Sequence, residues 1–351
     1  MSLHNTLAVI SQAGCSLSFF SLTSGARVLH ISNLTAQPHE VAYDSESKRL
    51  FISHTYEYGF YNKHGAYAHY ISVFDIENQA VSRIIDTSPY RGPHGVRLSP
   101  DAKILYAAIE DGFTDSGPGG VIGIDLTSSE YPIIKAVPSA ARCHWLALAD
   151  NGRKAYTTNK ELQYISVLDL AGAKLTKTIP FPGSEEGDVS PDGRFAYYPF
   201  PTLSLISVKP AEEFGFKVID TTTDEVVRTV LTDVPVMSVK SVSNDKVLVV
   251  HFASEIDAAS KQLVPLNSKV SVYDTHNFEH QGEVEVGLFP LTTLVASGDE
   301  TVFVANMASG TVDVVDLRQM KVAKTLEVDD GVGKVQNAPI NQGAHGMALI
   351  V

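Results

Sequence analysis

The sequence predicts an all-β protein, a single seven-bladed β-propeller that spans residues 1–351. Three observations carry this prediction. A strand-like segment recurs seven times at intervals of about 42 to 54 residues, and the two chain ends supply the missing parts of one repeat. No segment shows the 3.6-residue period of an amphipathic helix. A repeat of this length, built from strands alone, is typical of propeller blades.

Each copy of the recurring segment is a short apolar run that ends in an acidic or small polar residue. The runs are rich in β-branched and aromatic residues, which favour strands, and turn residues separate them. The seven copies are Leu17–Ser21, Ile71–Asp75, Val121–Asp125, Ile165–Asp169, Phe216–Asp220, Val270–Asp274 and Val312–Asp316.

A complete repeat contains four such runs. The Asp-ended run is followed by a tight turn and a second run, of which Val227–Leu231 is an example. A loop then leads to a run such as His94–Asp101, whose Ser-Pro-Asp corner precedes a fourth run, Ile104–Ala108. Four antiparallel strands in a unit of this length make one propeller blade.

The chain ends complete the seventh blade. Residues 345–351 read as an innermost strand with nothing after it, and Leu7–Ile10 read as a second strand with nothing before it. Pairing them hydrogen-bonds two otherwise free strand edges and fixes both termini. We therefore expect segment 345–351 to pair with segment 6–12, so that the ring closes.

Composition limits the classes of partner. The chain has 27 basic and 40 acidic residues and a net charge of −13, which argues against nucleic acid or an anionic membrane. It has no apolar run of about 18 residues, and residues 1–14 lack the features of a signal peptide. Two cysteines cannot form a disulfide framework. We expect a cytoplasmic monomer or small homo-oligomer that acts on a small-molecule substrate.

Long loops mark one end of the predicted ring as the functional end. Residues 54–69, 110–119, 199–215 and 253–268 all fall at the mouth where the innermost strands begin. The first residues of five consecutive innermost strands are His345, His39, His94, His144 and Glu185, although the chain has only 12 histidines. Positions near Ser238 and Leu291 break the pattern on the last two blades.

This register predicts a catalytic cluster of His39, His94, His144 and His345 with Glu185 and Glu186. Imidazole and carboxylate groups on adjoining blades can serve as acid and base. The alternative is structural: repeats copy a Pro-His-Gly turn, and each histidine then bonds a neighbouring blade or a channel water.

A second set of polar residues is expected to bind substrate at the same mouth. It lies mainly at the ends of the second strands, which also include Gln12, and a tyrosine-rich loop adds an aromatic wall. Two arginines can hold a carboxylate with paired hydrogen bonds. The set is His54, Tyr56, Arg91, Glu110, Arg142, Asn159, His251 and Asn306.

The repeats resemble the seven-bladed propellers of the YVTN and lactonase-like superfamily. The resemblance lies in Pro93–Asp101, in Glu185–Gly193 and in the Val-Ser-Val-Tyr-Asp strands, and it covers essentially the whole chain. It implies a lactonase, a cycloisomerase or a lyase, since that superfamily hosts several chemistries on one fold.

Three functions remain open on the residues. The first is metal-free ring opening, ring closure or elimination on a small oxygenated or aromatic molecule. The second places one divalent transition metal between His39, His94, His144 and His345, with Glu40, Glu110 or Glu185 accepting from the imidazole N–H groups. That spacing resembles the four-histidine iron centre of carotenoid oxygenase propellers, although none of that family's other motifs is present. The third is a binding protein without catalysis.

Overall fold

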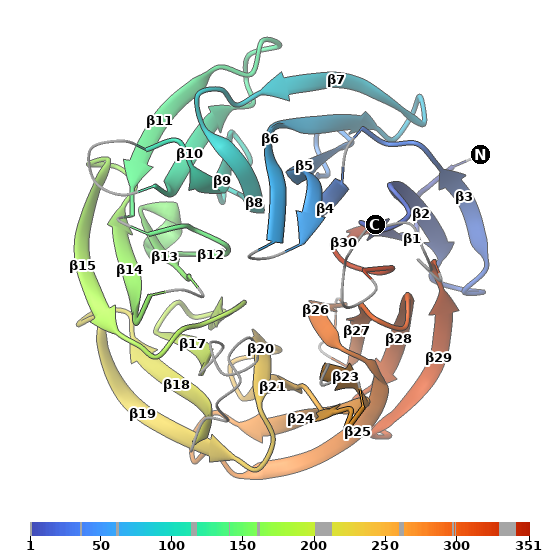
Figure 1. The fold of residues 1–351 in the computed structure, drawn as a ribbon, viewed down its shortest axis with the longest axis vertical. Coiled ribbons are helices and arrows are strands. Elements are labelled where there is room, and N and C mark those ends of the chain that lie inside the picture. Colours follow the sequence, from blue (N-terminus) through green and yellow to red (C-terminus); the bar gives the residue numbers. More distant parts are fainter. Residues whose placement is uncertain are drawn as a thin grey trace.

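Seven four-stranded antiparallel sheets form a closed ring around a central axis (Figure 1). The computed structural model describes residues 2–35, 37–60, 63–113, 118–139, 141–159, 162–200, 213–259, 263–296, 298, 300–329 and 342–351. The predicted all-β propeller with four strands per blade is confirmed. Among the described residues, the one helical element is the short 3-10 turn η1 (Asp150–Gly152), and none is a helix that could cross a membrane.

The first four blades follow one another along the chain, each with its innermost strand first. Blade one is β4 (Gln37–Asp44), β5 (Arg49–Phe60), β6 (Lys63–Asp75) and β7 (Ala80–Asp86). Blade two is β8 (Arg91–Leu98), β9 (Ile104–Asp111), β10 (Gly120–Asp125) and β11 (Ile133–Pro138). Blade three is β12 (Leu146–Ala149), β13 (Lys154–Thr157), β14 (Tyr164–Asp169) and β15 (Lys174–Pro180). Blade four is β16 (Asp188–Val189), β17 (Phe195–Phe200), β18 (Phe214–Asp220) and β19 (Glu225–Thr232).

Blade five carries an extra hairpin between its second and third strands. It is β20 (Val236–Ser241), β21 (Lys246–His251), β24 (Asn267–Asp274) and β25 (His280–Leu288), with β22 (Ser254–Ile256) and β23 (Leu263–Pro265) as the hairpin. Blade six is β26 (Pro290–Val295), β27 (Thr301–Asn306), β28 (Thr311–Asp316) and β29 (Lys321–Glu327). Blade seven is β30 (Met347–Ile350), β1 (Thr6–Ser11), β2 (Ser16–Ser21) and β3 (Arg27–Ile31).

The termini close the ring as predicted. β30 pairs antiparallel with β1, with Ala348 opposite Ala8 and Ile350 opposite Thr6. The pairing continues beyond the strand, because the His345 N–H donates to the carbonyl of Ile10 over 2.8 Å. Both chain ends therefore lie in one blade, as Figure 1 shows.

The recurring aspartate at the end of each third strand is a turn residue. The side chain of Asp75 accepts a hydrogen bond from the backbone N–H of Asn78 over 2.8 Å, and Asp125, Asp220, Asp274 and Asp316 accept equivalent bonds two residues on. Asx turns of this kind reverse the chain tightly. The same chemistry therefore recurs once per blade and produces the period seen in the sequence.

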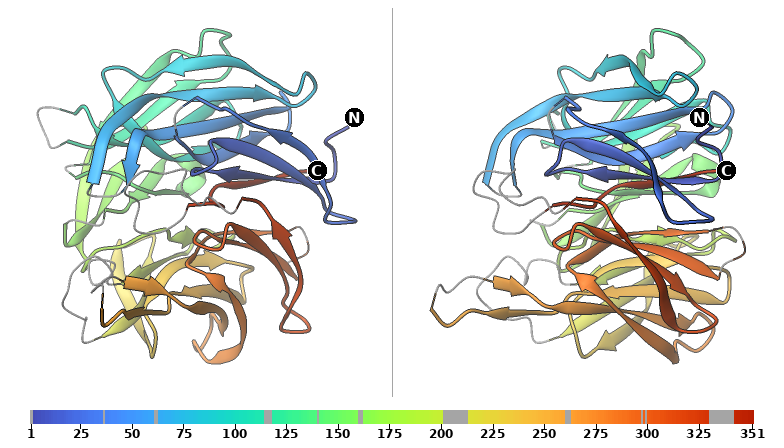
Figure 2. Two further views of the ribbon diagram at one scale, coloured as in Figure 1. Left: turned by 45° about the vertical axis from the view of Figure 1, so that its right-hand side comes forward. Right: turned by 90° about the vertical axis from the view of Figure 1, so that its right-hand side faces the viewer.

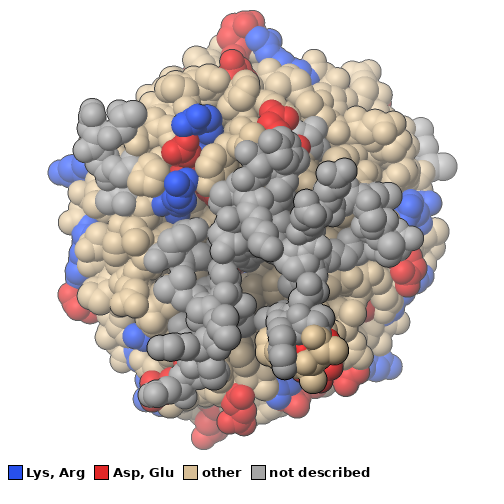
Figure 3. Space-filling model, in the orientation of Figure 1, with Lys and Arg blue, Asp and Glu red and all other residues tan. Residues whose placement is uncertain are grey.

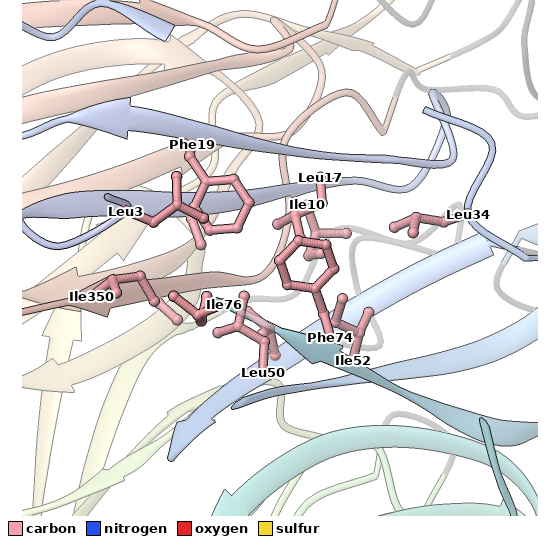
Figure 4. Close-up of a cluster of buried hydrophobic side chains, with 13 residues drawn as sticks. Leu3, Ile10, Leu17, Phe19, Leu34, Leu50, Ile52, Phe74, Ile76 and Ile350 are labelled. Carbon is pink, nitrogen blue, oxygen red and sulfur yellow. The ribbon is translucent and has the colours of Figure 1, made fainter. Parts of the chain in front are cut away.

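Apolar clusters between neighbouring blades hold the ring together. The cluster between blades seven and one includes Phe19 and Phe74, whose ring centroids lie 5.6 Å apart, and it draws in Ile350 from the C-terminal strand (Figure 4). Equivalent clusters lie between the other blades. Cys143 is buried in one of them.

The two ends of the ring differ. The long β5–β6 hairpin and the β22–β23 hairpin extend from the same end, well past the other strands (Figure 2). Figure 3 shows the molecule in the orientation of Figure 1. The coloured acidic and basic side chains lie mostly near the rim, and there is a hollow at the centre. Much of the predicted 199–215 loop lies outside the described residues.

Candidate functional site

Four histidine rings come together where innermost strands begin near the axis. The ring centroids of His39 and His345 lie 4.1 Å apart, those of His39 and His94 lie 4.2 Å apart, and those of His94 and His144 lie 5.0 Å apart. All four side chains are buried. The convergence that the sequence register predicts is therefore present, as one continuous row of imidazoles across four blades.

A β-bulge at the start of the innermost strand aims two of these side chains, His39 and His94. In blade one, Pro38 pairs with His54 and Val41 pairs with Ile52. The three-residue advance from Pro38 to Val41 on β4 is therefore matched by an advance of only two residues on β5. Blades two and six carry the same irregularity. A bulge inserts one unpaired residue and turns side chains away from simple alternation. His39 and its neighbour Glu40 consequently both contact His345.

The glycine after a cluster histidine lets the neighbouring blade approach. A Cβ on Gly346 would lie 2.7 Å from the carbonyl oxygen of His39, and the Gly346 N–H donates to that same oxygen over 3.0 Å. Gly95 likewise donates to the carbonyl of His144 over 2.9 Å. The His-Gly pairs thus join blades through backbone bonds, as the structural alternative supposes, and in doing so bring the imidazoles together.

Two glutamates lie against the ends of the histidine row. Oε1 of Glu40 lies 2.7 Å from Nδ1 of His345, and Oε1 of Glu110 lies 2.7 Å from Nδ1 of His144. Each glutamate belongs to a group of two histidines and one carboxylate whose ligand atoms lie within 4.8 Å of one another: His39, Glu40 and His345, and His94, Glu110 and His144. Tyr56 donates to Glu110 over 3.1 Å.

The Glu40 carboxylate is held ionised. Burial by itself would raise its pKa, but the imidazoles of His345 and then His39 outweigh that effect and lower the pKa to about 2. Oε1 of Glu40 and Nδ1 of His345 face each other as a buried carboxylate–imidazole pair at 2.7 Å. Together with His39 they form a buried group that offers the ligand types a transition metal ion prefers.

A small cavity of about 10 Å³ lies beside the row, with room for about one water molecule or one ion. His39, His94 and His345 line this cavity. His144 does not line it but contacts the ring of His94. Glu185 also lines it, and its Oε2 accepts from the indole N–H of Trp145 over 3.1 Å. An organic molecule does not fit in this space.

Glu186 is not part of this cluster, in contrast to its predicted place beside Glu185. Its Oε1 accepts from Arg97 over 2.8 Å, and it lines a different cavity further along the channel. Burial raises its pKa to about 7, against the lowering effects of Arg97 and Lys240. Glu185 and Glu186 lie just before β16, and each lines a different cavity.

The raised pKa of Glu186 predicts a pH-dependent stability. The folded protein binds this proton more tightly than the unfolded chain, so ionising Glu186 costs stability as pH rises from about 4.5 to about 7. Glu186→Gln keeps the acceptor for Arg97 but cannot ionise. As the pH rises from 5 to 8, the free energy of unfolding of the variant, relative to that of the unchanged protein, should increase by up to about 3 kcal/mol.

Denaturant titrations across that pH range measure the difference. The exposed Glu279→Gln is the control, and parallel curves for Glu186→Gln would contradict the assignment.

Most of the predicted substrate-binding residues are held elsewhere. His54 bonds Ser72 over 2.8 Å and His251 bonds Ser271 over 2.9 Å, each within its own blade. Burial lowers the pKa of His54 to about 3, helped by His39, and that of His251 to about 4. The side chains of Asn159 and Asn306 also bond residues of their own blades.

The two arginines are paired near the mouth. Arg91 forms an ion pair with Asp111, and Arg142 donates to the hydroxyl of Tyr67 over 2.8 Å. Of the predicted substrate-binding set, only Tyr56 and Glu110 join the histidine cluster. Tyr61 of the tyrosine-rich loop lies outside the described residues.

The sequence reasoning missed Trp145, whose ring centroid lies 5.1 Å from that of His94. Met307 and Gln342 also line the small cavity and were not singled out. Trp145 is the single tryptophan and follows His144 directly, which is the signal that could have identified it. Its ring also lies 6.0 Å from the guanidinium of Arg97, a residue that lines the second cavity.

The fold and this cluster together define a seven-bladed propeller with a buried histidine–glutamate site on its axis. No family model and no curated protein matches the chain. Solved structures share its fold. A functionally unknown protein from Desulfotomaculum acetoxidans DSM 771 is 14% identical, with a TM-score of 0.68 and 98% of both chains covered.

Two further neighbours are named enzymes. Kuenenia stuttgartiensis hydrazine synthase is 15% identical, with a TM-score of 0.64 over 89% of this chain and 82% of that one. The dihydro-heme d1 dehydrogenase NirN, in complex with DHE, is 10% identical, with a TM-score of 0.60 over 99% of this chain and 76% of that one. At these identities the likeness establishes the propeller fold alone, and the resemblance to the YVTN and lactonase-like superfamily stays a prediction.

Proposed function

We propose that this protein is an enzyme that holds a divalent transition metal ion in its histidine–glutamate row and acts on a small oxygenated or aromatic molecule. The observation that carries the proposal is the buried group of His39, Glu40 and His345, whose ligand atoms lie within 4.8 Å of one another, beside a cavity the size of one ion. Imidazole with carboxylate is a donor set that suits zinc, iron and copper.

The rest of the row supports the same ion. His39 offers a third ligand to the Glu40 and His345 pair, and the second group of His94, Glu110 and His144 lies directly beside it. Carboxylates that contact metal-binding imidazoles fix the orientation of the ring and raise its basicity. A bound ion would act as a Lewis acid on an oxygen of the substrate or of water.

The protein's own groups have definite tasks in this proposal. The Trp145 ring packs against His94 and shields it from solvent. Its indole N–H donates to Glu185 and so positions that carboxylate. The hydroxyl of Tyr56 donates a hydrogen bond to Glu110, and this bond holds Glu110 against His144. The substrate body lies outside the ion-sized cavity, with only its reacting oxygen at the row.

A second candidate function uses the same residues without a metal. The contacts of 2.7 Å between Glu40 and His345 and between Glu110 and His144 are those of carboxylate–imidazole pairs, in which the carboxylate strengthens the base. Such a pair can open or close a ring or carry out an elimination by proton transfer. Glu40 and Glu110 then take the part predicted for Glu185 and Glu186.

Metal analysis of the purified protein separates the two candidates. We expect about one equivalent of transition metal per chain, removed by a strong chelator and restored by adding the ion back. Glu40→Gln should lower the retained metal markedly, because it removes a charged ligand oxygen, whereas the exposed Glu279→Gln should not. Protein that contains no metal and takes up none from zinc, iron or copper salts would rule out the metal centre and leave the metal-free chemistry.

A further inference from the structure

A second and much larger cavity lies further along the channel. It has a volume of about 350 Å³ and is lined by residues of the innermost strands that follow the cluster positions in the chain, including Val41, Arg97, Leu294 and Leu349. Ligand pockets for small molecules begin at roughly 300 Å³. The cavity therefore has room for an organic molecule, in contrast to the ion-sized space beside the histidine row.

One part of its wall is apolar. Leu98, Leu294 and Leu349 come from three different blades and present half-buried side chains to the cavity, and Tyr43 adds an aromatic ring. Burying such side chains against a ligand gains about 25 cal/mol for each Å² removed from water. This wall fits the hydrocarbon body of a small molecule.

The other part is polar and contains unsatisfied atoms. Oε2 of Glu186 and the hydroxyl oxygens of Thr292 and Thr293 have no hydrogen-bond partner within the described ranges, although all three residues are at least 94% buried. Buried polar atoms of this kind normally have partners. Arg97 and Lys240 stand at the same end, fixed by Glu186 and Asp188 over 2.8 and 2.9 Å.

Charge decides which ligand chemistry fits. The lining holds two basic side chains, Arg97 and Lys240, and two acidic ones, Glu40 and Glu186, of which Glu186 has a raised pKa, so neither sign of charge is in large excess and an ionic ligand gains little net attraction. A hydroxyl group can donate one hydrogen bond and accept two. It can donate to Oε2 of Glu186 while it accepts from Lys240 or a threonine hydroxyl.

We propose that this cavity is a binding site for a small neutral alcohol or phenol, with its hydroxyl at Glu186 and its hydrocarbon body against Leu98, Leu294 and Leu349. The cavity shares Glu40 with the histidine–glutamate row, but none of the four row histidines lines it. The proposal does not depend on a metal ion in that row.

Fluorine NMR titration of the full chain with 4-fluorophenol tests the site. We expect saturable binding with a Kd on the order of 1 mM, a typical value for a ligand of so few atoms. Fluorobenzene lacks the hydroxyl, and 4-fluorobenzoate and 4-fluorobenzylamine carry a charge. Each should bind at least about tenfold more weakly. Absence of saturable binding, which means that the cavity holds water only, overturns the proposal, and so does equal or tighter binding of either charged analogue.

Variants locate the binding. Ala42→Phe fills the cavity and should abolish binding, and Glu186→Gln, which keeps the side-chain shape, should weaken it about fivefold or more. His94→Gln in the histidine row and Leu231→Ala on an outer strand should leave it unchanged. Loss of binding in His94→Gln with retention in Glu186→Gln would place the phenol at the histidine row and overturn the assignment. The Glu186→Gln result stands alone if Ala42→Phe does not fold.

Discussion

Deletion of residues 347–351 is expected to unfold most of the protein at 37 °C. The deletion removes β30, which buries Met347, Ala348 and Ile350 and pairs with four residues of β1. Burial of side chains of this size contributes about 1.5 to 3 kcal/mol each for the larger two, and the lost backbone pairing adds to that. A loss of about 5 kcal/mol or more is comparable with the whole stability of a typical protein.

Calorimetry and size-exclusion chromatography measure this effect. The truncated chain also exposes the edge of β1, so we expect aggregation together with a lowered Tm. Deletion of Val351 alone is the matched control, since that residue is largely exposed and makes no strand pair. A truncated chain that melts with the full-length protein would show that closure of the ring contributes little.

Replacement of His94 or His345 by Gln is expected to lower metal affinity by about 100-fold or more, because each change removes an imidazole from the row. Both residues are buried at 3% exposure, so some loss of Tm is expected as well. The ring of His94 packs against that of Trp145, with the centroids 5.1 Å apart, so its replacement also removes buried contacts.

The control has to be a histidine that is equally buried and lies outside the row. His251→Gln meets that condition, because His251 bonds Ser271 inside blade five. It should lower Tm to a similar extent while the protein retains its metal after dialysis. If His251→Gln loses the metal as readily as His94→Gln, the effect is general destabilisation, and the row is not the metal site.

The sequence by itself determined the propeller, its seven blades and the closure. These features depend on interactions that repeat locally. The Asx turn after each third strand, as at Asp75 and Asp274, and the alternation of apolar residues within strands are set by neighbours in the chain. Closure followed because the two incomplete ends, near Leu7 and Met347, fit only one another. The approach of four histidines followed from their common register in the blades.

The tertiary structure decided which carboxylates accompany the histidines. Strand alternation places Glu40 on the face opposite His39, but the bulge between Pro38 and Val41 turns both toward His345. Glu185 and Glu186, which precede β16, line different cavities, and His54 turns into its own blade to bond Ser72. The sizes of the two cavities were likewise beyond the sequence. A bulge, a side chain's direction and an enclosed volume all depend on contacts between blades far apart in the chain, which no local pattern encodes.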